Sequence, residues 1–567
     1  MTKLLYTKLE FGQEGLRGLL RMKKIFSQFK AVALLTKSSV IAFTATVALL
    51  AFSCKSVDKE AVKVASVDES TLDYFIEKGD FNKANEIINQ VSKAANLSKA
   101  DEYIINFEKD KMQRMLNEFT VTDEEALEYI KKYIPDVTEE QMEAWRQHGD
   151  LECKTINGKR LYFRKALNNL FLVNSECVAA REKLEGKETG TTGDFLKDYL
   201  PPVIKNSVLT QKKNKDRSAT FSNPVKITVH IKMRVMPDAV PAGEVVRMWL
   251  PFPKENDRQK NVTVERVFNA HNSEYKELEV PKTPDLLKGF YTGDYLISSN
   301  NNTRRSMYFE MEANGKDTLK VGYDLSFTSF NQYFAFLEER IQPYDTTSAI
   351  YKRYTAERER HIVFTDKIKH LADSLVGDAK EPYEKVKRIW CWVTENIPWA
   401  GARDYSTIPN IPEYVLKHHH GDCGQVSLLF ITMARYEGIP ARWQSGWMLH
   451  PNHVNLHDWA EVYYEGVGWV PVDQSFGYSG GDRDTYAAKG ELTEDEQRLK
   501  FFFSRGLDAF RYIVNDDYGA WAPLYPAKIY PHYDEVDFQM GEVEWKGGNV
   551  LNGSNGWKCW MEAEYQY

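Results

Sequence analysis

The sequence predicts an α+β protein made of several folded units. Three patterns support this class: helical periodicity over residues 71–187, period-two alternation over residues 222–336, and helices mixed with a β-hairpin over residues 345–480. The chain has 567 residues, which is enough for roughly three or four units of about 150 residues each. Its 43% apolar and 27% charged residues exclude a polytopic membrane protein, and its 13% aromatic residues exclude a wholly disordered chain.

The composition gives no support to two further classes, a nucleic-acid-binding protein and a disulfide scaffold. The chain has 74 Lys and Arg residues against 81 Asp and Glu residues, a formal net charge of −7. Nucleic-acid binding depends on a basic face that neutralises phosphates. The six cysteines are too sparse for a disulfide scaffold, so each is considered singly. They stand at positions 54, 153, 177, 391, 423 and 559.

The first 54 residues are predicted to be an export signal. Residues 40–52 are apolar and uncharged, and lysines precede them. The stretch is shorter than the ~20 apolar residues that a membrane-spanning helix needs, so it fits the apolar region of a cleaved signal. Met22 is an alternative start of that signal. We therefore expect an exported protein of the cell envelope, with a polar tether over residues 55–70.

Cys54 is a candidate lipid anchor. A small residue stands before it at the end of the apolar stretch, which resembles the lipobox of bacterial lipoproteins. In that motif the cysteine is acylated and becomes the mature N-terminus. The resemblance implies an outer-membrane or periplasmic lipoprotein attached to the membrane. The alternative is an ordinary thiol in an anchor that stays uncleaved.

Residues 71–187 are predicted to form a mainly helical domain with one β-hairpin. Thr122 stands three residues before Glu125, the pattern of a capping box, and apolar residues recur at helical spacing after it. Asn157-Gly158 between two alternating segments predicts a tight hairpin turn. Helices followed by such a hairpin occur in winged-helix DNA-binding domains, but an exported chain without a basic stripe has little opportunity to bind DNA. We expect a small interaction or spacer domain.

Residues 188–221 are predicted to be a linker and residues 222–336 a β-sandwich. The first segment contains Gly-Thr-Thr-Gly, Pro201-Pro202 and a run of Lys, Asn and Asp residues. In the second, short alternating segments are separated by Asn, Gly and Pro, which is typical of an antiparallel sandwich. No group of residues in this domain suggests chemistry.

The segment that carries chemistry lies within residues 345–480. One helix is predicted over 382–397, and a second begins after Asp422, which precedes Gln425 by three residues as an N-cap does. Cys423 then falls in the first turn of the second helix. The helix dipole and the unsatisfied N–H groups there favour negative charge, so we expect a lowered thiol pKa and a thiolate near neutral pH.

A predicted β-hairpin downstream brings a histidine and an aspartate together. Two segments of strand character flank a turn that contains glycines. If the turn pivots on Glu465, with Gly466 in the left-handed position, His457 pairs with Asp473 on one side of the sheet. A shift of one residue would turn Asp473 to the opposite side. A histidine base oriented by an aspartate is what a thiol nucleophile on a facing helix requires.

Together these segments resemble the transglutaminase-like superfamily. The resemblance is carried by GDCGQVSLLFITMARYEGIPARW and, further along, by LHDWAEVYYEGVGWVPVDQSFG. It covers residues 382–478, at most a quarter of the chain. It implies a papain-like α+β core in which Cys423 is the nucleophile, His457 the base and Asp473 the residue that orients the base.

The resemblance also has implications outside these three residues. Family members carry an aromatic residue upstream of the nucleophile that helps to hold an oxyanion, and Trp399 is the nearest candidate. A β-sandwich before the core and an aromatic-rich C-terminal extension resemble the architecture of exported proteins of Bacteroidetes-type bacteria. We expect the extension, residues 481–567, to pack on the core.

The reaction that the resemblance implies is acyl transfer through a thioester. The thiol would attack a peptide bond or a glutamine carboxamide of a protein or peptide substrate. Water as the acceptor makes the protein a cysteine peptidase or amidase, and an amine makes it a cross-linking transglutaminase; the residues leave both open. A different class is open as well, a non-catalytic envelope scaffold that binds a partner through the same fold.

The histidine clusters do not predict a metal centre. Residues 418–420 are three consecutive histidines, and His450, His453 and His457 follow downstream. Pro451 prevents a helical metal-binding face in the second group, and no Cys and His pair has zinc spacing. We expect neither a metal nor another cofactor, and the sequence gives no indication of the oligomeric state.

Overall fold

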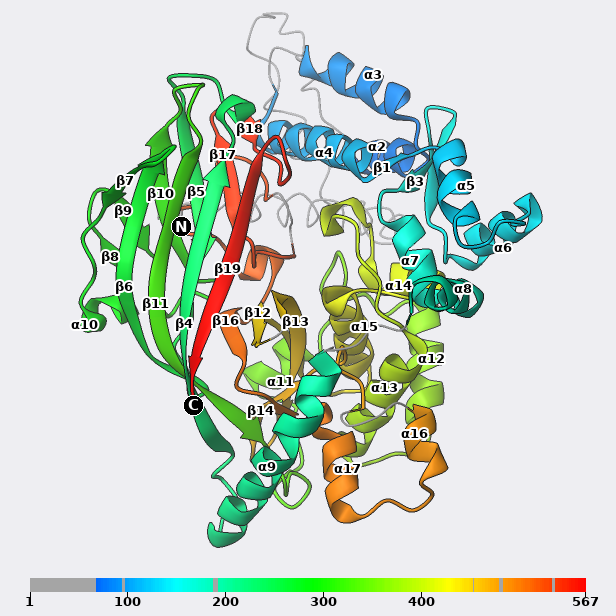
Figure 1. Cartoon of the computed structure of the whole chain (residues 1–567), viewed down its shortest axis with the longest axis vertical. Coiled ribbons are helices and arrows are strands. Elements are labelled where there is room, and N and C mark those ends of the chain that lie inside the picture. Colours follow the sequence, from blue (N-terminus) through cyan, green and yellow to red (C-terminus); the bar gives the residue numbers. More distant parts are fainter. Residues whose placement is uncertain (1–67, 94–96, 187–191, 452, 479–482, 533–535) are drawn as a thin grey trace, which may run out of the picture. The chain divides into compact units, whose positions relative to one another are not determined.

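The computed structural model describes the chain except residues 1–67, 94–96, 187–191, 452, 479–482 and 533–535. The predicted export signal and Cys54 therefore lie outside the described residues. The chain divides into two units, Met1–Lys109 and Asp110–Tyr567, whose elements are labelled in Figure 1. In the part of the chain that is described, no helix combines the length and the apolar character needed to cross a membrane.

The first unit is helical where it is described. It contains α2 (Glu69–Glu77), α3 (Phe81–Ser92) and the beginning of α4 (Lys99–Glu118). Asp68 and Asp80 are the N-caps of α2 and α3, and each side chain accepts a hydrogen bond from a main-chain N–H in the first turn. Local capping signals therefore place the starts of these helices.

The second unit begins with helices around a small antiparallel sheet of order β1-β3-β2. Two sequence predictions are confirmed here: Thr122 and Glu125 form a capping box, and Asn157 and Gly158 turn between two strands with φ of 49° and 85°. The elements are β1 (Phe119–Val121), α5 (Asp123–Lys131), α6 (Glu139–His148), β2 (Cys153–Ile156), β3 (Lys159–Phe163), α7 (Ala166–Val173) and α8 (Ser175–Glu185).

A helix occupies most of the segment that the sequence predicts to be a linker. α9 (Thr192–Lys213) runs through Pro201 and Pro202. A proline inside a helix removes a main-chain hydrogen bond, but the apolar side of α9 is buried against the core, and this burial outweighs the loss. The buried apolar residues of α9 are Leu196, Leu200, Val203 and Ile204.

The predicted β-sandwich is present, and strands from residues 481–567 complete both of its sheets. Its strands are β4 (Phe221–Val235), β5 (Val245–Pro251), β6 (Gln259–His271), β7 (Glu274–Glu277), β8 (Phe290–Tyr291), β9 (Tyr295–Ile297), β10 (Ser306–Glu312), β11 (Leu319–Tyr333), β15 (Gly506–Leu507), β17 (Glu542–Trp545), β18 (Gly548–Asn549) and β19 (Trp557–Gln566). One sheet has the order β18-β17-β5-β10-β9-β8, and the other has the order β19-β4-β11-β6-β7 with β15 beside β11. The short helices η2 (Pro237–Ala239) and α10 (Thr283–Lys288) connect strands. The C-terminal segment therefore contributes strands to the sandwich, and other parts of it, including Phe502, Phe503 and strand β16 (Arg511–Asn515), belong to the core.

The core combines helices with an antiparallel sheet of order β14-β13-β12-β16. The strands are β12 (Ala441–His450), β13 (His453–Tyr464), β14 (Gly468–Val472) and β16 (Arg511–Asn515). The helices are α11 (Ala349–Tyr354), α12 (Asp366–Val376), α13 (Pro382–Asn396), η3 (Tyr405–Thr407), α14 (Ile411–His418), α15 (Cys423–Tyr436), α16 (Arg483–Ala488), α17 (Glu494–Lys500), η4 (Phe502–Ser504) and η5 (Gly519–Trp521). This mixture of helices and antiparallel sheets confirms the predicted fold class.

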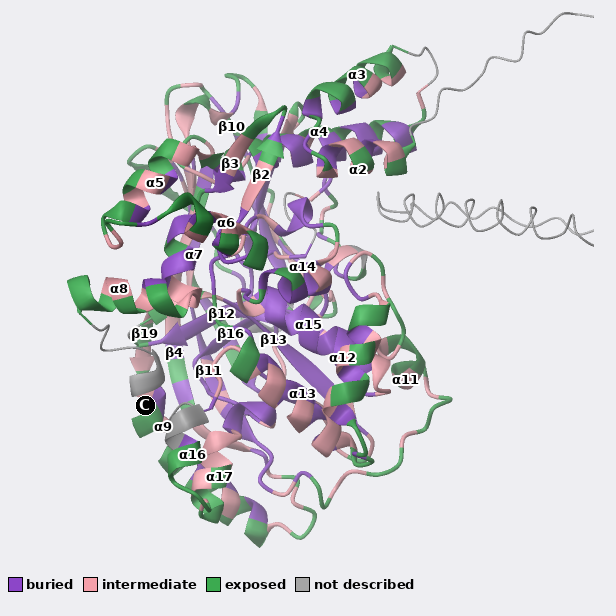
Figure 2. Cartoon of the chain, turned by 90° about the vertical axis from the view of Figure 1, so that its right-hand side faces the viewer, coloured by how far each residue is buried: buried purple, intermediate pink, exposed green. Residues whose placement is uncertain are grey.

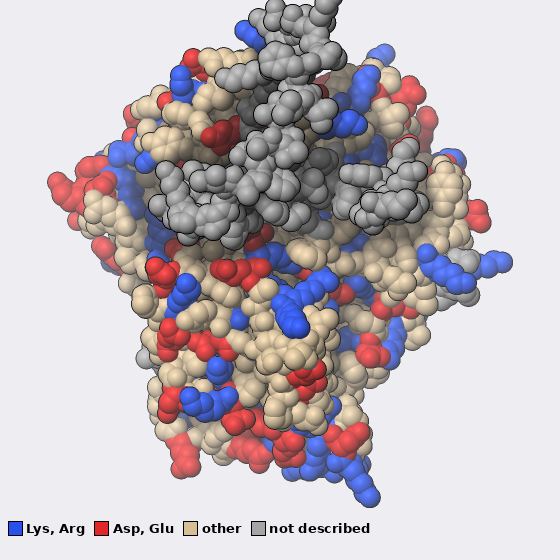
Figure 3. Space-filling model, turned by 180° about the vertical axis from the view of Figure 1, so that it is seen from behind, with Lys and Arg blue, Asp and Glu red and all other residues tan. Residues whose placement is uncertain are grey.

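Charged side chains of both signs are interspersed over the face seen in Figure 3. Charges of opposite sign also form pairs in the described structure, for example Arg505 with Glu338 at 2.6 Å and Lys489 with Glu496 at 3.3 Å. The face shown therefore has no extended field of one sign.

Candidate active site

Helix α15 places Cys423 at its first position. Asp422 is the N-cap: its Oδ1 accepts a hydrogen bond from Gln425 N at 3.1 Å, and Gln425 Oε1 accepts one from Asp422 N at 3.2 Å. This capping box confirms the helix start predicted from the sequence. The helix contacts α12, α13, α14, β12 and β13, and nearly all of it is buried (Figure 2). The packing thus fixes the sulfur relative to the sheet.

The register of the β13–β14 hairpin differs by two residues from the predicted one. Tyr464 pairs with Gly468, so the turn is centred on Gly466, whereas the sequence predicts a turn centred on Glu465. Gly466 and Gly468 both have positive φ, 78° and 98°. Because Gly468 is left-handed as well as Gly466, the centre of the turn lies one residue later than predicted. Because side chains alternate with a period of two, the offset leaves Asp473 on its predicted face.

The structure brings His457 and Asp473 together. His457 Nε2 lies 2.7 Å from Asp473 Oδ2, and the two residues are 3% and 0% exposed. Burial alone would raise the pKa of Asp473, but the charges of His457 and Arg511 and the hydrogen bond from His457 hold it below its ordinary value. Asp473 is therefore ionised and able to orient the imidazole.

Arg511 is a site residue that the sequence analysis missed. Its Nη1 lies 3.0 Å from Asp473 Oδ2, and its Nε donates to Asp508 Oδ2 at 2.9 Å. His450 Nε2 lies 3.2 Å from the other oxygen of Asp508. Arg511 begins β16, which lies in the C-terminal extension, residues 481–567. No local pattern marks it, because only the pairing of β16 with β12 brings it to Asp473.

The thiol of Cys423 contacts a carboxylate that the sequence analysis also left without a role. Its Sγ donates a hydrogen bond to Asp458 Oδ2 at 3.5 Å. In the described residues, no hydrogen bond joins the thiol to His457. Asp458 directly follows His457 in the sequence. Side chains of neighbouring residues in a strand point to opposite faces, so the sequence does not predict that Asp458 belongs to the same site as His457.

The pKa of Cys423 is raised well above its ordinary value, so the predicted lowering is wrong. Burial is the largest cause, and the carboxylates of Asp458, Asp422 and Asp537 act in the same direction. A hydrogen bond from the main chain of Asp458 acts in the opposite direction. The helix start that the sequence predicts is present, but neighbouring acids and burial outweigh its dipole.

Trp399 lies beside the start of α15 through its main chain. It forms a parallel bridge with Gly421, and Ala400 N donates to Gly421 O at 3.1 Å. The indole itself is 53% exposed. Trp399, the predicted oxyanion residue, therefore pairs through its main chain with Gly421, which stands two residues before Cys423. Its side chain lies at the surface.

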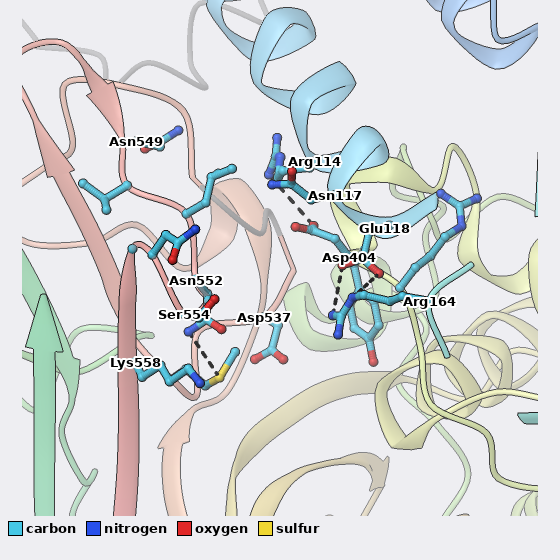
Figure 4. Close-up of a pocket in the computed structure, with 18 of the residues that line it drawn as sticks. Arg114, Asn117, Glu118, Arg164, Asp404, Asp537, Asn549, Asn552, Ser554 and Lys558 are labelled. Carbon is cyan, nitrogen blue, oxygen red and sulfur yellow. Dashed lines mark hydrogen bonds and ion pairs between the residues drawn. The ribbon is translucent and has the colours of Figure 1, made fainter. Parts of the chain in front are cut away.

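A cavity of about 930 Å³ reaches the helix cap next to the thiol. Tyr405 and Asp422 line it, and the Tyr405 hydroxyl donates a hydrogen bond to Asp422. Figure 4 shows two walls with Asp537 between them. One wall carries Arg114, Asn117, Glu118, Arg164 and Asp404, and the other carries Asn549, Asn552, Ser554 and Lys558. The cavity is therefore polar, and four stretches of the second unit line it, within residues 114–165, 238–239, 402–422 and 537–558.

The described cysteines form no disulfide, and two of the three consecutive histidines contact a main-chain carbonyl group. His418 Nδ1 and His420 Nε2 both lie near the Gly149 carbonyl oxygen, at 3.2 and 3.3 Å. In the described part of the chain, the carboxylates that come within 4.8 Å of one another as a group able to hold a metal are Glu69, Asp73 and Glu108 of the first unit.

Residues 369–474 match the family model of the transglutaminase-like superfamily, and this part of the chain is a transglutaminase-like domain. An uncharacterized protein of Haemophilus influenzae is 24% identical over 255 residues, which cover 40% of this chain and 66% of that protein. The uncharacterized protein YebA of Bacillus subtilis is 24% identical over 133 residues, which cover 20% of this chain and 18% of YebA. The chain thus spans less than two thirds of the length of either curated relative.

Two crystal structures are similar to this chain at low identity. One is that of a cysteine protease candidate from Cytophaga hutchinsonii, with a TM-score of 0.38, 14% identity, and coverage of 61% of this chain and 91% of that one. The other is the periplasmic domain of TgpA from Pseudomonas aeruginosa, with a TM-score of 0.20, 16% identity, and coverage of 47% and 97%.

Proposed function

We propose that this protein is a thiol-dependent acyl-transfer enzyme that acts on peptide bonds or glutamine carboxamides. The observation that carries the proposal is the buried pair of His457 and Asp473, 2.7 Å apart, on a sheet whose strand β13 packs against the helix that begins with Cys423. An oriented imidazole next to a helix-borne thiol is the arrangement that nucleophilic catalysis by cysteine needs. The match of this segment to the transglutaminase-like superfamily supports the same reaction class.

The residue types define the proposed steps. Asp473 accepts the hydrogen bond from Nε2 of His457, which leaves Nδ1 as the basic nitrogen. Cys423 attacks the carbonyl carbon while its proton passes to His457. The C–N bond of the tetrahedral intermediate then breaks, and His457 returns the proton to the departing amine or ammonia. The product on the protein is a thioester at Cys423.

The oxyanion of the tetrahedral intermediate needs hydrogen-bond donors. Main-chain N–H groups at the start of α15 are donors of this kind, and the indole N–H of Trp399 is a further candidate. Loss of a single such donor lowers kcat by about 10²–10³ in enzymes that use one. Trp399→Phe keeps the ring and removes the donor, so its effect on kcat measures that role.

We assign the substrate to the cavity of Figure 4. Its walls offer amide, hydroxyl and charged groups, and Asp422, the residue before Cys423, is part of its lining. These groups suit a polar segment of a protein or peptide, because main-chain amides can bond to Asn and Ser side chains.

A thiol-directed peptide aldehyde tests the proposal. We expect it to label Cys423 in the full chain, and we expect Cys423→Ser to remove the label and His457→Ala to reduce it by at least about 10²-fold. Circular dichroism checks that both variants are folded. Absence of labelling in the folded wild-type protein would contradict the proposal.

A second assay distinguishes the two acceptors. The protein is incubated with a glutamine-containing peptide and a labelled primary amine, and the masses of the products are measured by mass spectrometry. An uncut peptide that carries the amine identifies a transglutaminase, and a shortened or deamidated peptide identifies a peptidase or amidase.

A non-catalytic scaffold is the second candidate function. It is favoured by the hydrogen bond of the thiol to Asp458, which contrasts with the bond to an imidazole that an activated cysteine makes. A protein of this kind would bind a protein partner in the cavity and would leave both the aldehyde probe and the glutamine peptide unchanged.

We also propose that the chain is exported and lipid-anchored at Cys54. The apolar stretch over residues 40–52 and the small residue before the cysteine support this. Mass measurement of the mature N-terminus tests it, since an acylated Cys54 as first residue is expected and an unprocessed chain would contradict it.

A further inference from the structure

The contact between Asp458 and Cys423 is built from three parts of the fold. Asp458 Oδ2 accepts the hydrogen bond of the thiol, and Gln539 Nε2 holds the other carboxylate oxygen. Asp458 is only 2% exposed. Gly424 makes room for this approach, because a Cβ at that position would lie 2.8 Å from Asp458 Oδ2. The carboxylate is therefore held against the sulfur rather than resting there by chance.

The titratable groups that face the sulfur come from four segments. Asp458 belongs to β13, Asp422 is the cap of α15, Asp537 belongs to the C-terminal segment, and Tyr405 belongs to η3. Carboxylates near a sulfur disfavour its anion by repulsion between like charges. In the described structure the thiol donates its hydrogen bond to Asp458, which is also next to His457 in the chain.

We propose that Asp458 keeps Cys423 as a neutral thiol in the free protein, so that the proton leaves only as the sulfur attacks the substrate. The inference rests on the proposed function and concerns the timing of its first step. As the S–C bond forms, the S–H bond breaks, its proton goes to His457 Nδ1, and the carbonyl π electrons move to the oxygen. His457 is then a general base in the attack, and no thiolate–imidazolium pair exists beforehand.

The reactivity of the thiol toward 2,2′-dithiodipyridine tests this timing without any substrate. The rate is measured from about pH 4 to 10 for the full chain and for Asp458→Asn, with Cys423→Ser to subtract the other cysteines. The amide has the shape of the carboxylate and keeps the main-chain N–H but carries no charge. We expect the midpoint of the profile to fall by about one unit or more.

The size of the rate change follows from two opposing effects. A midpoint that is lower by one pH unit gives about ten times more thiolate at a pH below both midpoints. A less basic thiolate attacks a disulfide more slowly, so the net gain in rate is about threefold per unit. Asp537→Asn is the matched control, since Asp537 faces the same sulfur but is not hydrogen-bonded to it in the described structure. We expect its shift to be smaller than that of Asp458→Asn.

Two results would overturn the inference. One is a wild-type midpoint below the ordinary thiol value of about 8.5, which needs no variant and so is unaffected by any folding defect. The other is a folded Asp458→Asn protein with the wild-type profile.

The outcome is separate from that of the proposed function. A neutral thiol that ionises more readily in Asp458→Asn supports the inference even if no amide is turned over. Turnover by a protein with a low-pH midpoint would support the enzyme and contradict only the role of Asp458.

Discussion

At the scale of single residues, Arg511 compensates two buried carboxylates at once. Its guanidinium bonds to Asp473 and Asp508, and all three side chains are buried. Removing one partner of a buried ion pair leaves an uncompensated charge, which is far more destabilising than never having buried the pair. The orientation of the candidate base therefore depends on a residue outside the predicted triad.

We expect Arg511→Met to lower the free energy of unfolding at neutral pH by about 3–5 kcal/mol. Methionine fills similar space but leaves Asp473 and Asp508 without their cation. Urea denaturation followed by circular dichroism measures the change. Arg266→Met is the control, because Arg266 and Glu277 form an exposed pair that is worth about 0–1 kcal/mol.

The same variant has a predicted pH dependence. The pKa of Asp473 and that of Asp508 are lowered in the folded protein, so their stabilisation is complete above the unfolded value of about 3.9 and is lost as the pH falls through the folded values. Without Arg511 these folded values rise. The difference in stability between wild type and Arg511→Met should therefore begin to shrink as the pH falls through the raised folded values of the variant, and should go on shrinking down to the lowered folded values of the wild type. A difference that stays constant across this acid range would contradict this account.

The position of Cys423 at the helix start is predictable from the sequence, but the predicted direction of its pKa shift is wrong. Asp422 and Gln425 are enough to predict the helix start, because a cap depends on neighbours in the chain. The acids that raise the thiol pKa include Asp458 and Asp537, and their distance from the sulfur depends on tertiary packing. Local signals therefore predict position better than electrostatics.

At the scale of elements, the β13–β14 hairpin shows why face is easier to predict than register. Any even offset keeps Asp473 on the side of His457, so the alternating pattern fixes the face. The register depends on the conformation of the turn glycines. The prediction places Gly466 in the left-handed conformation, but in the structure Gly468 adopts a left-handed conformation as well. The same limit applies to α9, where prolines suggest a break and only the buried contacts reveal a helix.

The two turn glycines allow a matched test of this hairpin. A Cβ at Gly466 would lie 2.8 Å from the Arg340 carbonyl oxygen, whereas a Cβ at Gly468 would have no atom within 4 Å. Each substitution by alanine costs about 1–2 kcal/mol for the left-handed backbone. We expect Gly466→Ala to cost a further ~1–3 kcal/mol from the close approach. Equal values in urea denaturation would show that the turn does not pack against Arg340.

At the scale of the whole second unit, the C-terminal segment ties the core to the sandwich. It contributes β16 to the core sheet and then β17, β18 and β19 to the two sandwich sheets. β19 pairs with β4 along its length, from Trp557 opposite Val235 to Gln566 opposite Lys226. The sequence could not reveal this, because the alternation of a strand does not say which distant strand is its partner.

This connectivity predicts that damage in β19 is felt at Cys423. Trp557 is buried and its Nε1 donates to Val550 O at 2.7 Å, so Trp557→Ala should destabilise the unit by about 3–5 kcal/mol. Because the segment runs through both sheets, we expect sandwich and core to unfold in one transition. The urea midpoint for exposure of Cys423 to dithiodipyridine should then fall together with the midpoint seen by circular dichroism.

Trp560→Ala is the control on the same strand, since Trp560 is only partly buried and its loss should move both midpoints less. If Trp557→Ala moved the circular dichroism midpoint and left the exposure of Cys423 unchanged, the core would be stable without the sandwich. The C-terminal segment would then be a connection rather than a structural part of the unit that holds the candidate site.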